Sequence, residues 1–224
     1  IWNKKMNNNN RLFLLSNEDK KKQNKRNNRK TKCFDECFIY KKEELIILQG
    51  GKNNQGSYVE ILNKMIEQLD IALQIHKRLM VLRVDLHSTY YTGNNRQFSK
   101  FINRLKQWIY RNYRIRNIGH VWAREQERAK TQHYHLALFL DENKIRHPKK
   151  LIAQIKEMWA PYGHMPVIKN PYYSINKSNF KEQRPETIRR ISYLAKVRGK
   201  GYRNKQAKDF STSRLKTTSK VEEN

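Results

Sequence analysis

The sequence predicts an α+β domain with a ferredoxin-like (split βαβ) antiparallel sheet, helices on one face of that sheet, and a C-terminal helix that carries a tyrosine. Apolar and polar residues alternate from Leu82 to His87, within a strand expected over 79–88, whereas the segments before and after it have helical periodicity. Two more strand patterns, over 118–127 and 132–140, are separated by only a few residues, which indicates an antiparallel hairpin. The expected order from 79 to 169 is therefore β-α-β-β-α-β.

The first three elements follow from the pattern between residues 57 and 112. Apolar residues recur every three or four positions over about 57–77, which predicts an amphipathic helix. The strand over 79–88 comes next, and a second amphipathic helix is expected over about 95–112. The apolar face of the strand holds Leu82, Val84 and Leu86. Its polar face holds Arg83, Asp85 and His87.

The remaining strands and one more helix complete the expected sheet. The hairpin over 118–127 and 132–140 supplies its second and third strands. Pro148 opens a helix that stops before Pro161, and 164–169 reads as a weak fourth strand. With two helices on one face, the other face is expected to lie open for function.

A last helix is expected after a loop over 170–183. Pro185 lies in its first turn, and Gly199 and Gly201 end it. One side of this helix is apolar, and the opposite side gathers Arg189, Tyr193, Lys196 and Lys200. A tyrosine surrounded by cations is well suited to meet a phosphate.

Two terminal segments are expected to be flexible. Residues 1–32 are biased towards Asn and Lys, and residues 203–224 have few apolar residues to bury. Residues 33–202 are expected to form one domain, in which the helix over about 57–77 is an N-terminal extension.

The charge of the chain points to a polyanionic partner. The formal net charge is +28, and residues 1–32 contribute only +9 of it, with eleven Lys and Arg against Glu18 and Asp19. The rest of the chain is therefore strongly basic, which favours nucleic acid as the partner.

Other classes of partner and compartment are less well supported. No apolar run approaches the roughly 18 residues that a membrane span needs, and no signal peptide is evident at the start. Cys33 and Cys37 could supply half of a zinc site, but no second half is apparent, so two reduced thiols are expected. These features predict a cytoplasmic protein without membrane contact.

The strand over 132–140 begins with two histidines, His133 and His135, separated by one tyrosine. Alternate residues of a strand share a face, so both imidazoles can bind one ion. The alternative is that the histidines are ordinary packing residues. In a tight hairpin that pairs Glu125 with His135, Glu127 lies opposite His133, and either carboxylate can be the third ligand.

Glu125 is the preferred third ligand. Two imidazoles and one carboxylate leave open positions for a phosphate oxygen and for water, which suits Mn²⁺ or Mg²⁺, although zinc also fits the nitrogens. Alternatively, each glutamate is an exposed charge beside Arg124 or Arg128. Asp85 and His87 could orient the metal ligands or contact DNA, or could simply face solvent.

Three segments in this order, "LRVDLHS", "HYHLALFL" and "YLAK", resemble the HUH endonuclease superfamily. The Tyr-x-x-Lys spacing of Tyr193 and Lys196 resembles the single-tyrosine Rep type. Within that type, "VWAREQE", "HYHLALFLD" and "RRISYLAKVRGKG" resemble the inovirus-type replication initiators of filamentous phages and prophages. The resemblance covers about 79–202.

The resemblance implies a metal-dependent, site-specific nickase and ligase of single-stranded or hairpin DNA at a rolling-circle origin. His133 and His135 would be metal ligands, Tyr193 the nucleophile, and Lys196 an assisting cation, with a 5′-phosphotyrosine intermediate. No Walker-type segment is present, so unwinding would require a separate host helicase. The aromatics Tyr90, Tyr91, Tyr172 and Tyr173 could stack on bases.

Other functions are compatible with the same pattern. The chain could be a non-catalytic module or a zinc-stabilised regulator that binds single-stranded nucleic acid, although its exposed strand faces carry Asp, His and Glu instead of aromatics. It could also be a relaxase or a single-strand transposase that uses the same chemistry.

Overall fold

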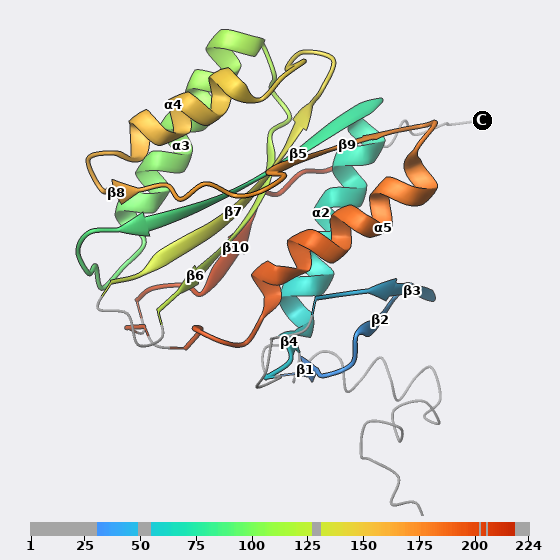
Figure 1. The fold of residues 1–224 in the computed structure, drawn as a ribbon, viewed down its shortest axis with the longest axis horizontal. Helices are drawn as coiled ribbons and strands as arrows, with labels where there is room; N and C mark the ends of the chain where they lie inside the picture. The colour runs from blue at the N-terminus through green and yellow to red at the C-terminus, as the bar shows by residue number, and fades with distance from the viewer. Residues whose placement is uncertain (1–30, 49–54, 127–130, 202, 205, 218–224) are drawn as a thin grey trace, which may run out of the picture.

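An antiparallel sheet forms the centre of the molecule (Figure 1), a computed structural model that describes residues 31–48, 55–126, 131–201, 203–204 and 206–217. Its longest strand is β5 (Arg78–Ser88), which pairs with β7 (His133–Asp141). Strand β7 pairs in turn with β6 (Gly119–Glu125), and β6 pairs with β10 (Phe210–Thr212). The chain is thus of the α+β class, and all of these pairings are antiparallel.

Two short strands share the other edge of β5. β8 (Gly163–His164) pairs with its end at His87 and Ser88, and β9 (Tyr172–Asn176) pairs with its first half. The fourth strand expected over 164–169 is therefore wrong in position. Val167 is fully exposed, whereas β9, in the segment expected to be a loop, buries Ile175 against β5.

Four α-helices cover both faces of the sheet in the described part of the chain (Figure 1). α3 (Arg96–Tyr113) and α4 (Lys149–Trp159) lie on one face. α2 (Val59–Ile75) and α5 (Phe180–Ile191) lie on the other. The expectation of an open second face is wrong, because α2 is not an outlying extension but a layer of the domain.

The alternating side chains of β5 supply both halves of the core. Met80, Leu82 and Leu86 pack with α3 and α4 in one hydrophobic cluster, and Leu79 and Val81 pack with α2 and α5 in the other. Since both faces bury apolar residues, the sheet is sandwiched between two helical layers. The polar residues near the end of β5 lie beyond the α2–α5 core.

A small peripheral sheet and a hairpin cap the lower part of the α2–α5 layer. β1 (Lys32–Cys33) pairs with β4 (Ser57–Tyr58), and β2 (Cys37–Tyr40) pairs with β3 (Glu43–Ile46). The hairpin turns at two lysines with positive φ and buries Phe38 and Leu45 in the α2–α5 core. Cys33 and Cys37 are free thiols.

The segment that carries Tyr193 differs from the expected long helix. α5 begins at Phe180, so Pro185 lies inside it, and the helix ends at Ile191. A single 3-10 turn, η2 (Ser192–Ala195), follows, and Lys196 is already extended at φ −50° and ψ 137°. The Ser192 hydroxyl donates to the Arg189 carbonyl at 2.6 Å and accepts from Leu48 N–H at 2.9 Å, which favours a turn here over continued helix.

The terminal segments were expected to be flexible. Within the expected C-terminal tail, Phe210–Thr212 form β10, which extends the sheet beside β6. Residues 1–30 lie outside the described residues, and Lys32 is part of β1. Among the described residues, no helix is both long enough and apolar enough to span a bilayer.

Candidate metal centre and its tyrosine

The strands β6 and β7 bring Glu125 next to the two histidines. Glu125 pairs directly with His133, and Ala123 pairs with His135. The expected register, with Glu125 opposite His135, is therefore shifted by two residues. The ladder stops at Glu125 because the next N–H, of Gln126, donates to the Gly199 carbonyl at 2.7 Å. Glu127 lies outside the described residues.

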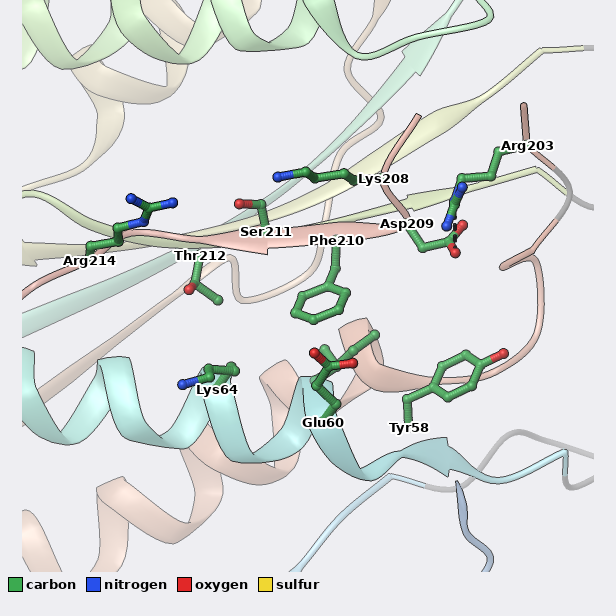
Figure 2. Close-up of a pocket in the computed structure, with 11 residues that line it drawn as sticks. Tyr58, Glu60, Lys64, Arg203, Lys208, Asp209, Phe210, Ser211, Thr212 and Arg214 are labelled. Atoms are coloured by element: carbon green, nitrogen blue, oxygen red, sulfur yellow. Dashed lines mark ion pairs between the residues drawn. The ribbon is translucent and has the colours of Figure 1, made fainter. Parts of the chain in front are cut away.

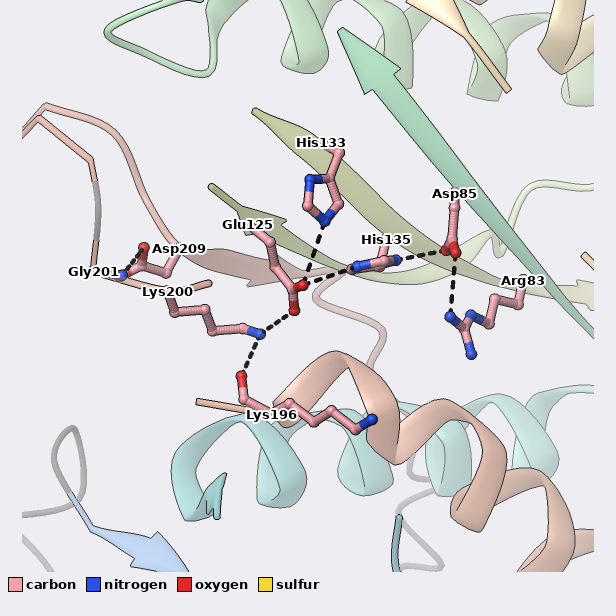
Figure 3. A network of polar contacts seen from close by, with 9 residues as sticks. All are labelled: Arg83, Asp85, Glu125, His133, His135, Lys196, Lys200, Gly201 and Asp209. Atoms are coloured by element: carbon pink, nitrogen blue, oxygen red, sulfur yellow. Dashed lines mark hydrogen bonds and ion pairs between the residues drawn. The ribbon is translucent and has the colours of Figure 1, made fainter. Parts of the chain in front are cut away.

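Three ligand atoms converge at this point (Figure 3). His133 Nε2 lies 3.4 Å from Glu125 Oε2, and His135 Nε2 lies 3.2 Å from the same oxygen. One ligand atom from each of the three residues falls within 4.8 Å of the other two. An ion about 2.1 Å from each ligand needs neighbouring ligands roughly 3 Å apart. Glu125, His133 and His135 thus form a largely buried group that could hold a metal ion, and this possible ligand set is called the metal-binding group below.

Asp85 fixes the orientation of His135. Their side chains meet at 2.6 Å between Oδ1 and Nδ1, and the ionised carboxylate can only accept, so Nδ1–H donates. This leaves Nε2 directed at Glu125, as a metal-ligating imidazole requires. Burial disfavours the charged form of Asp85, but His135 and Arg83 outweigh it and lower the Asp85 pKa. Burial likewise opposes protonation of His135, yet the carboxylates of Asp85 and Glu125 raise its pKa.

Lys200 neutralises the other oxygen of Glu125. Its ammonium donates to Glu125 Oε1 at 2.8 Å and to the Lys196 carbonyl at 2.5 Å, and its side chain is completely buried (Figure 3). Burial alone would raise the pKa of Glu125, but His133, His135 and Lys200 together lower it strongly. Lys200 therefore does not face outward with Arg189, and its ammonium supports the metal-binding group.

The glycine before Lys200 makes this approach possible. Gly199 has a φ of +78°, and a Cβ there would lie 3.0 Å from Glu125 Cβ. A side chain would thus be strained and crowded at the point where the chain turns Lys200 towards the carboxylate.

Tyr193 lies directly against the metal-binding group. Its ring meets the His135 ring edge to face, with 5.1 Å between centroids. The Lys196 ammonium lies 3.8 Å from the centroid of the tyrosine ring, and the Arg83 guanidinium carbon lies 4.4 Å from it. Two cations therefore lie over the ring of a tyrosine that packs beside a histidine.

Burial and nearby charges set the acidity of Tyr193. Burial raises the pKa of its phenol, the Glu125 and Asp85 carboxylates add to this, and Arg83 opposes them. Lys196 contacts the ring face, so its charge is not at the hydroxyl. These groups together therefore favour the protonated phenol.

A row of three histidines extends from Glu125 across β7, β5 and β8. Glu125 pairs with His133, His133 with His87, and His87 with His164. The His87 ring lies 5.1 Å from that of His133 and 5.0 Å from that of His164. Burial and these two neighbours lower the pKa of His87. Only glycine fits at 163, because a Cβ there would lie 1.8 Å from the His87 carbonyl oxygen.

Other expected site residues lie outside the group. Arg189 forms a bidentate pair with Glu186 on α5, at 2.7 and 2.8 Å. Tyr173 accepts a hydrogen bond from Arg190, whereas Tyr90, Tyr91 and Tyr172 are exposed. Sequence reasoning did not assign roles to Arg83 and His164. Arg83 lies on the same polar strand face as Asp85 and His87, and this spacing could have indicated that it belongs to the site.

The residues of the candidate site lie in a part of the chain that matches a known protein family. A family model described as the YagK/YfjJ C-terminal domain matches residues 40–213, which include the metal-binding group and Tyr193. The chain is also 25% identical over 187 residues to the uncharacterized protein YfjJ of Escherichia coli (strain K12). That alignment covers 65% of this chain and 90% of the relative.

Proposed function

The chain belongs to the YagK/YfjJ C-terminal domain family, and the metal-binding group and Tyr193 lie within the matched region. We infer a function from the geometry of these residues. We propose that the protein is a metal-dependent, site-specific nickase and ligase of single-stranded DNA, of the single-tyrosine HUH type. It initiates rolling-circle replication through a 5′-phosphotyrosine intermediate, in the manner of the inovirus-type initiators that the sequence resembles.

One observation carries this proposal. Tyr193 packs edge to face on His135, the histidine whose Nε2 belongs to the possible ligand set. A tyrosine nucleophile has to lie beside the ion that neutralises the scissile phosphate, and these two parts come from segments far apart in the sequence. A histidine pair without an adjacent tyrosine would favour a purely structural metal site.

The arrangement of the sheet agrees with the proposal. Read across the sheet, the strands are β9, β5, β7 and β6, with α3 and α4 on one face. This is the order of a ferredoxin-like sheet with β5 as its first strand. We assign the central part of the domain to that arrangement, with α2, α5 and β10 as additions.

Glu125, His133 and His135 would hold the divalent ion. When bound, Mn²⁺ or Mg²⁺ would polarise a non-bridging oxygen of the scissile phosphate. The mixed oxygen and nitrogen ligands fit these ions and also admit zinc. Asp85 keeps His135 in the ligating tautomer, and Lys200 holds Glu125 by its other oxygen.

The chain's own residues would perform a transesterification. The Tyr193 oxygen attacks phosphorus in line with the 3′ oxygen, forming the tyrosyl–phosphate bond as the P–O3′ bond breaks. The phenolic proton goes to the leaving 3′ oxygen, so one phosphodiester replaces another and no nucleotide is consumed. Arg83 and Lys196, whose cationic groups lie over the Tyr193 ring, would contact the non-bridging phosphate oxygens. Attack by a later 3′-hydroxyl reverses the step and joins ends.

The proposed partners follow from this chemistry. The net charge of +28 suits a DNA substrate, single-stranded or extruded as a hairpin at an origin. A separate host helicase would unwind the duplex, and the reaction would take place in the cytoplasm of a bacterial host.

A covalent adduct tests the proposal. A pool of 3′-labelled DNA hairpins with a randomised loop is incubated with the full chain and Mn²⁺, then separated on a denaturing gel. We expect a labelled band at the mass of protein plus DNA, absent with EDTA and in Tyr193→Phe. Tyr110→Phe, on the exposed surface of α3, is the matched control and should retain the band.

Loss of the band in His133→Ala, but not in His147→Ala, would tie the adduct to the metal-binding group. DNA binding without an adduct from any hairpin in the pool would instead favour the second candidate, a non-catalytic module that binds single-stranded nucleic acid. The buried Lys200–Glu125 pair favours that candidate, because it partly satisfies the carboxylate without an ion. A relaxase or transposase would give the adduct but select a different DNA site.

A further inference from the structure

A basic groove runs along α2, on the side of this helix that faces β10. Its first part, a cavity of about 440 Å³, lies between the start of α2 and β10 (Figure 2). A second cavity of about 540 Å³ continues along α2 to Ile71 and Thr217. Both cavities are lined by Lys64, Thr212 and Arg214, so they are neighbouring parts of one groove.

The groove is connected to the proposed active site through backbone contacts. Ser57, which precedes the groove residue Tyr58, forms an isolated β-bridge with Lys196. Asp209 lines the groove and accepts from the Gly201 N–H at 3.1 Å, one residue after Lys200 (Figure 3). A strand that leaves the groove at this end would therefore pass the segment that holds Tyr193 and Lys200.

The charges that line the groove favour a polyanion. Five cationic residues line it against three acidic ones, and two of the acids are already paired: Glu67 with Lys64, and Asp209 with Arg203. Three exposed cations remain, and none forms an ion pair with a residue in the described ranges. These are Lys208, Arg214 and Lys216.

Aromatic side chains accompany these cations. Tyr58 and Phe210 are half-buried where the groove begins, and Phe210 projects from β10 towards α2 (Figure 2). Cations with interleaved aromatics suit a single strand, whose phosphates bind the cations while its bases stack. From Glu60 to Ile71, α2 rises about 16 Å, which accommodates at most about five stacked nucleotides.

We propose that this groove binds the single-stranded DNA that flanks the cleaved position. The inference rests on the proposed function, since it places the DNA substrate of the same site. Lys208, Arg214 and Lys216 bind successive phosphates, and Tyr58 and Phe210 stack on a base near the entrance. An acidic peptide is the rival occupant, but β10 is only three residues long and offers little edge for strand pairing.

The test is a salt titration of DNA binding. The full chain with Tyr193→Phe, which cannot cleave, is titrated into fluorescein-labelled oligo(dT) of 20 nucleotides, and anisotropy gives the affinity at several NaCl concentrations. In this background, Lys208→Gln/Arg214→Gln/Lys216→Gln should reduce the salt slope by about 2, at roughly 0.7 per phosphate contact on single strands. At 0.1 M salt the affinity should fall between about 10-fold and 100-fold.

A matched triple variant controls for net charge. Arg104→Gln/Lys149→Gln/Lys156→Gln also removes one arginine and two lysines, all exposed, from α3 and α4 on the opposite face of the sheet. It should leave the salt slope almost unchanged. Near-UV circular dichroism should show both variants folded, because all six side chains are exposed.

Each result decides a different question. Equal weakening by the two triple variants would overturn the groove proposal, as would competition by poly-L-glutamate as strong as that by unlabelled oligo(dT). A chain that forms the tyrosyl adduct but shows such results keeps the proposed function and loses only the groove. A chain that binds DNA through the groove but forms no adduct keeps the groove and loses the nickase.

Discussion

Replacing Lys200 with methionine should destabilise the protein and make it more dependent on a divalent ion. Methionine keeps much of the apolar stem but removes the ammonium that donates to Glu125 and to the Lys196 carbonyl. Glu125 would then be buried with only the two histidines beside it. The change therefore isolates one buried charge pair within the metal-binding group.

The expected size follows from the geometry. Two unit charges 2.8 Å apart attract by about 6 kcal/mol at an effective dielectric constant of 20. Desolvation offsets much of this, and breaking a buried pair by removing one partner typically costs about 3–5 kcal/mol. The Lys200 side chain has no exposed surface and that of Glu125 has 10%, so the full range applies to Lys200→Met.

A double-mutant cycle measures the pair itself. Urea unfolding in EDTA gives the free energies of unfolding of wild type, Lys200→Met, Glu125→Gln and the double variant. We expect each single variant to lose about 3 kcal/mol or more, and the double variant to lose at least about 2 kcal/mol less than the sum.

Manganese adds a second readout. A bound Mn²⁺ gives Glu125 another cationic partner, so 1 mM MnCl₂ should stabilise Lys200→Met more than wild type. Lys149→Met, on the exposed side of α4, is the control and should change neither stability nor the manganese response. The reasoning is refuted if the two losses in the cycle add within about 0.5 kcal/mol, or if manganese stabilises wild type and Lys200→Met equally.

Three further predictions concern other parts of the molecule. Asp85→Asn should weaken Mn²⁺ binding about 10-fold in calorimetric titration, because it removes the negative charge that holds the His135 tautomer. Arg184→Met should lower the free energy of unfolding by about 2–3 kcal/mol, since the bidentate pair with Asp70, at 2.9 and 3.2 Å, joins α5 to α2 and is partly exposed. Burial lowers the pKa of His120 to about 3, with Lys106 adding to the effect, so the folded state resists protonation below the unfolded pKa of 6.5. The neutral His120 therefore contributes stability that is fully present above pH 6.5 and is lost as the pH falls towards the folded-state pKa. Between pH 6.5 and pH 5, the free energy of unfolding of wild type, measured in urea, should fall by about 2 kcal/mol more than that of His120→Leu.

The contrary results are equally specific. Unchanged manganese affinity in Asp85→Asn would show that His135 does not need the carboxylate. Equal stability of wild type and Arg184→Met would mean that the pair contributes nothing beyond its desolvation cost, and Arg184→Lys should fall between the two. Parallel pH profiles of wild type and His120→Leu would remove His120 as the titrating group.

The periodic segments of the fold were predictable because burial sets their periodicity. The first half of β5 is apolar on both faces because a core lies on each side of it, and its second half alternates because only one face is in a core. β6, β7, α3 and α4 agree with their expected bounds to within a few residues. The short elements were not predictable. β9 has five residues and β10 has three, and both are held by backbone pairing with β5 and β6. Segments this short show no clear alternation of apolar and polar residues.

The candidate site was predictable in its residue types but not in its register or its second layer. His-x-His places two imidazoles on one face, so His133 and His135 were evident from spacing. The hairpin register depends on where Gln126 leaves the ladder for Gly199, which is a tertiary contact. The sequence predicts one helix that continues past Ala195, which places Lys200 on the same side as Arg189. In the structure the helix has already ended, and the chain turns at Lys196. The ammonium of Lys200 therefore points inward, to Glu125.

The residues that support Glu125 and β6 come late in the sequence: Lys200 contacts Glu125, and β10 pairs with β6. During translation they are therefore made after the strands that they support. Glu125, His133 and His135 are synthesised first, and they are supported only after Lys200 and β10 have followed and docked beside β6. A nascent polypeptide that ends before Tyr193 thus holds the possible metal ligands but not the proposed nucleophile. The proposed strand-breaking capacity would therefore arise only after Tyr193 has been synthesised, well after the two histidines.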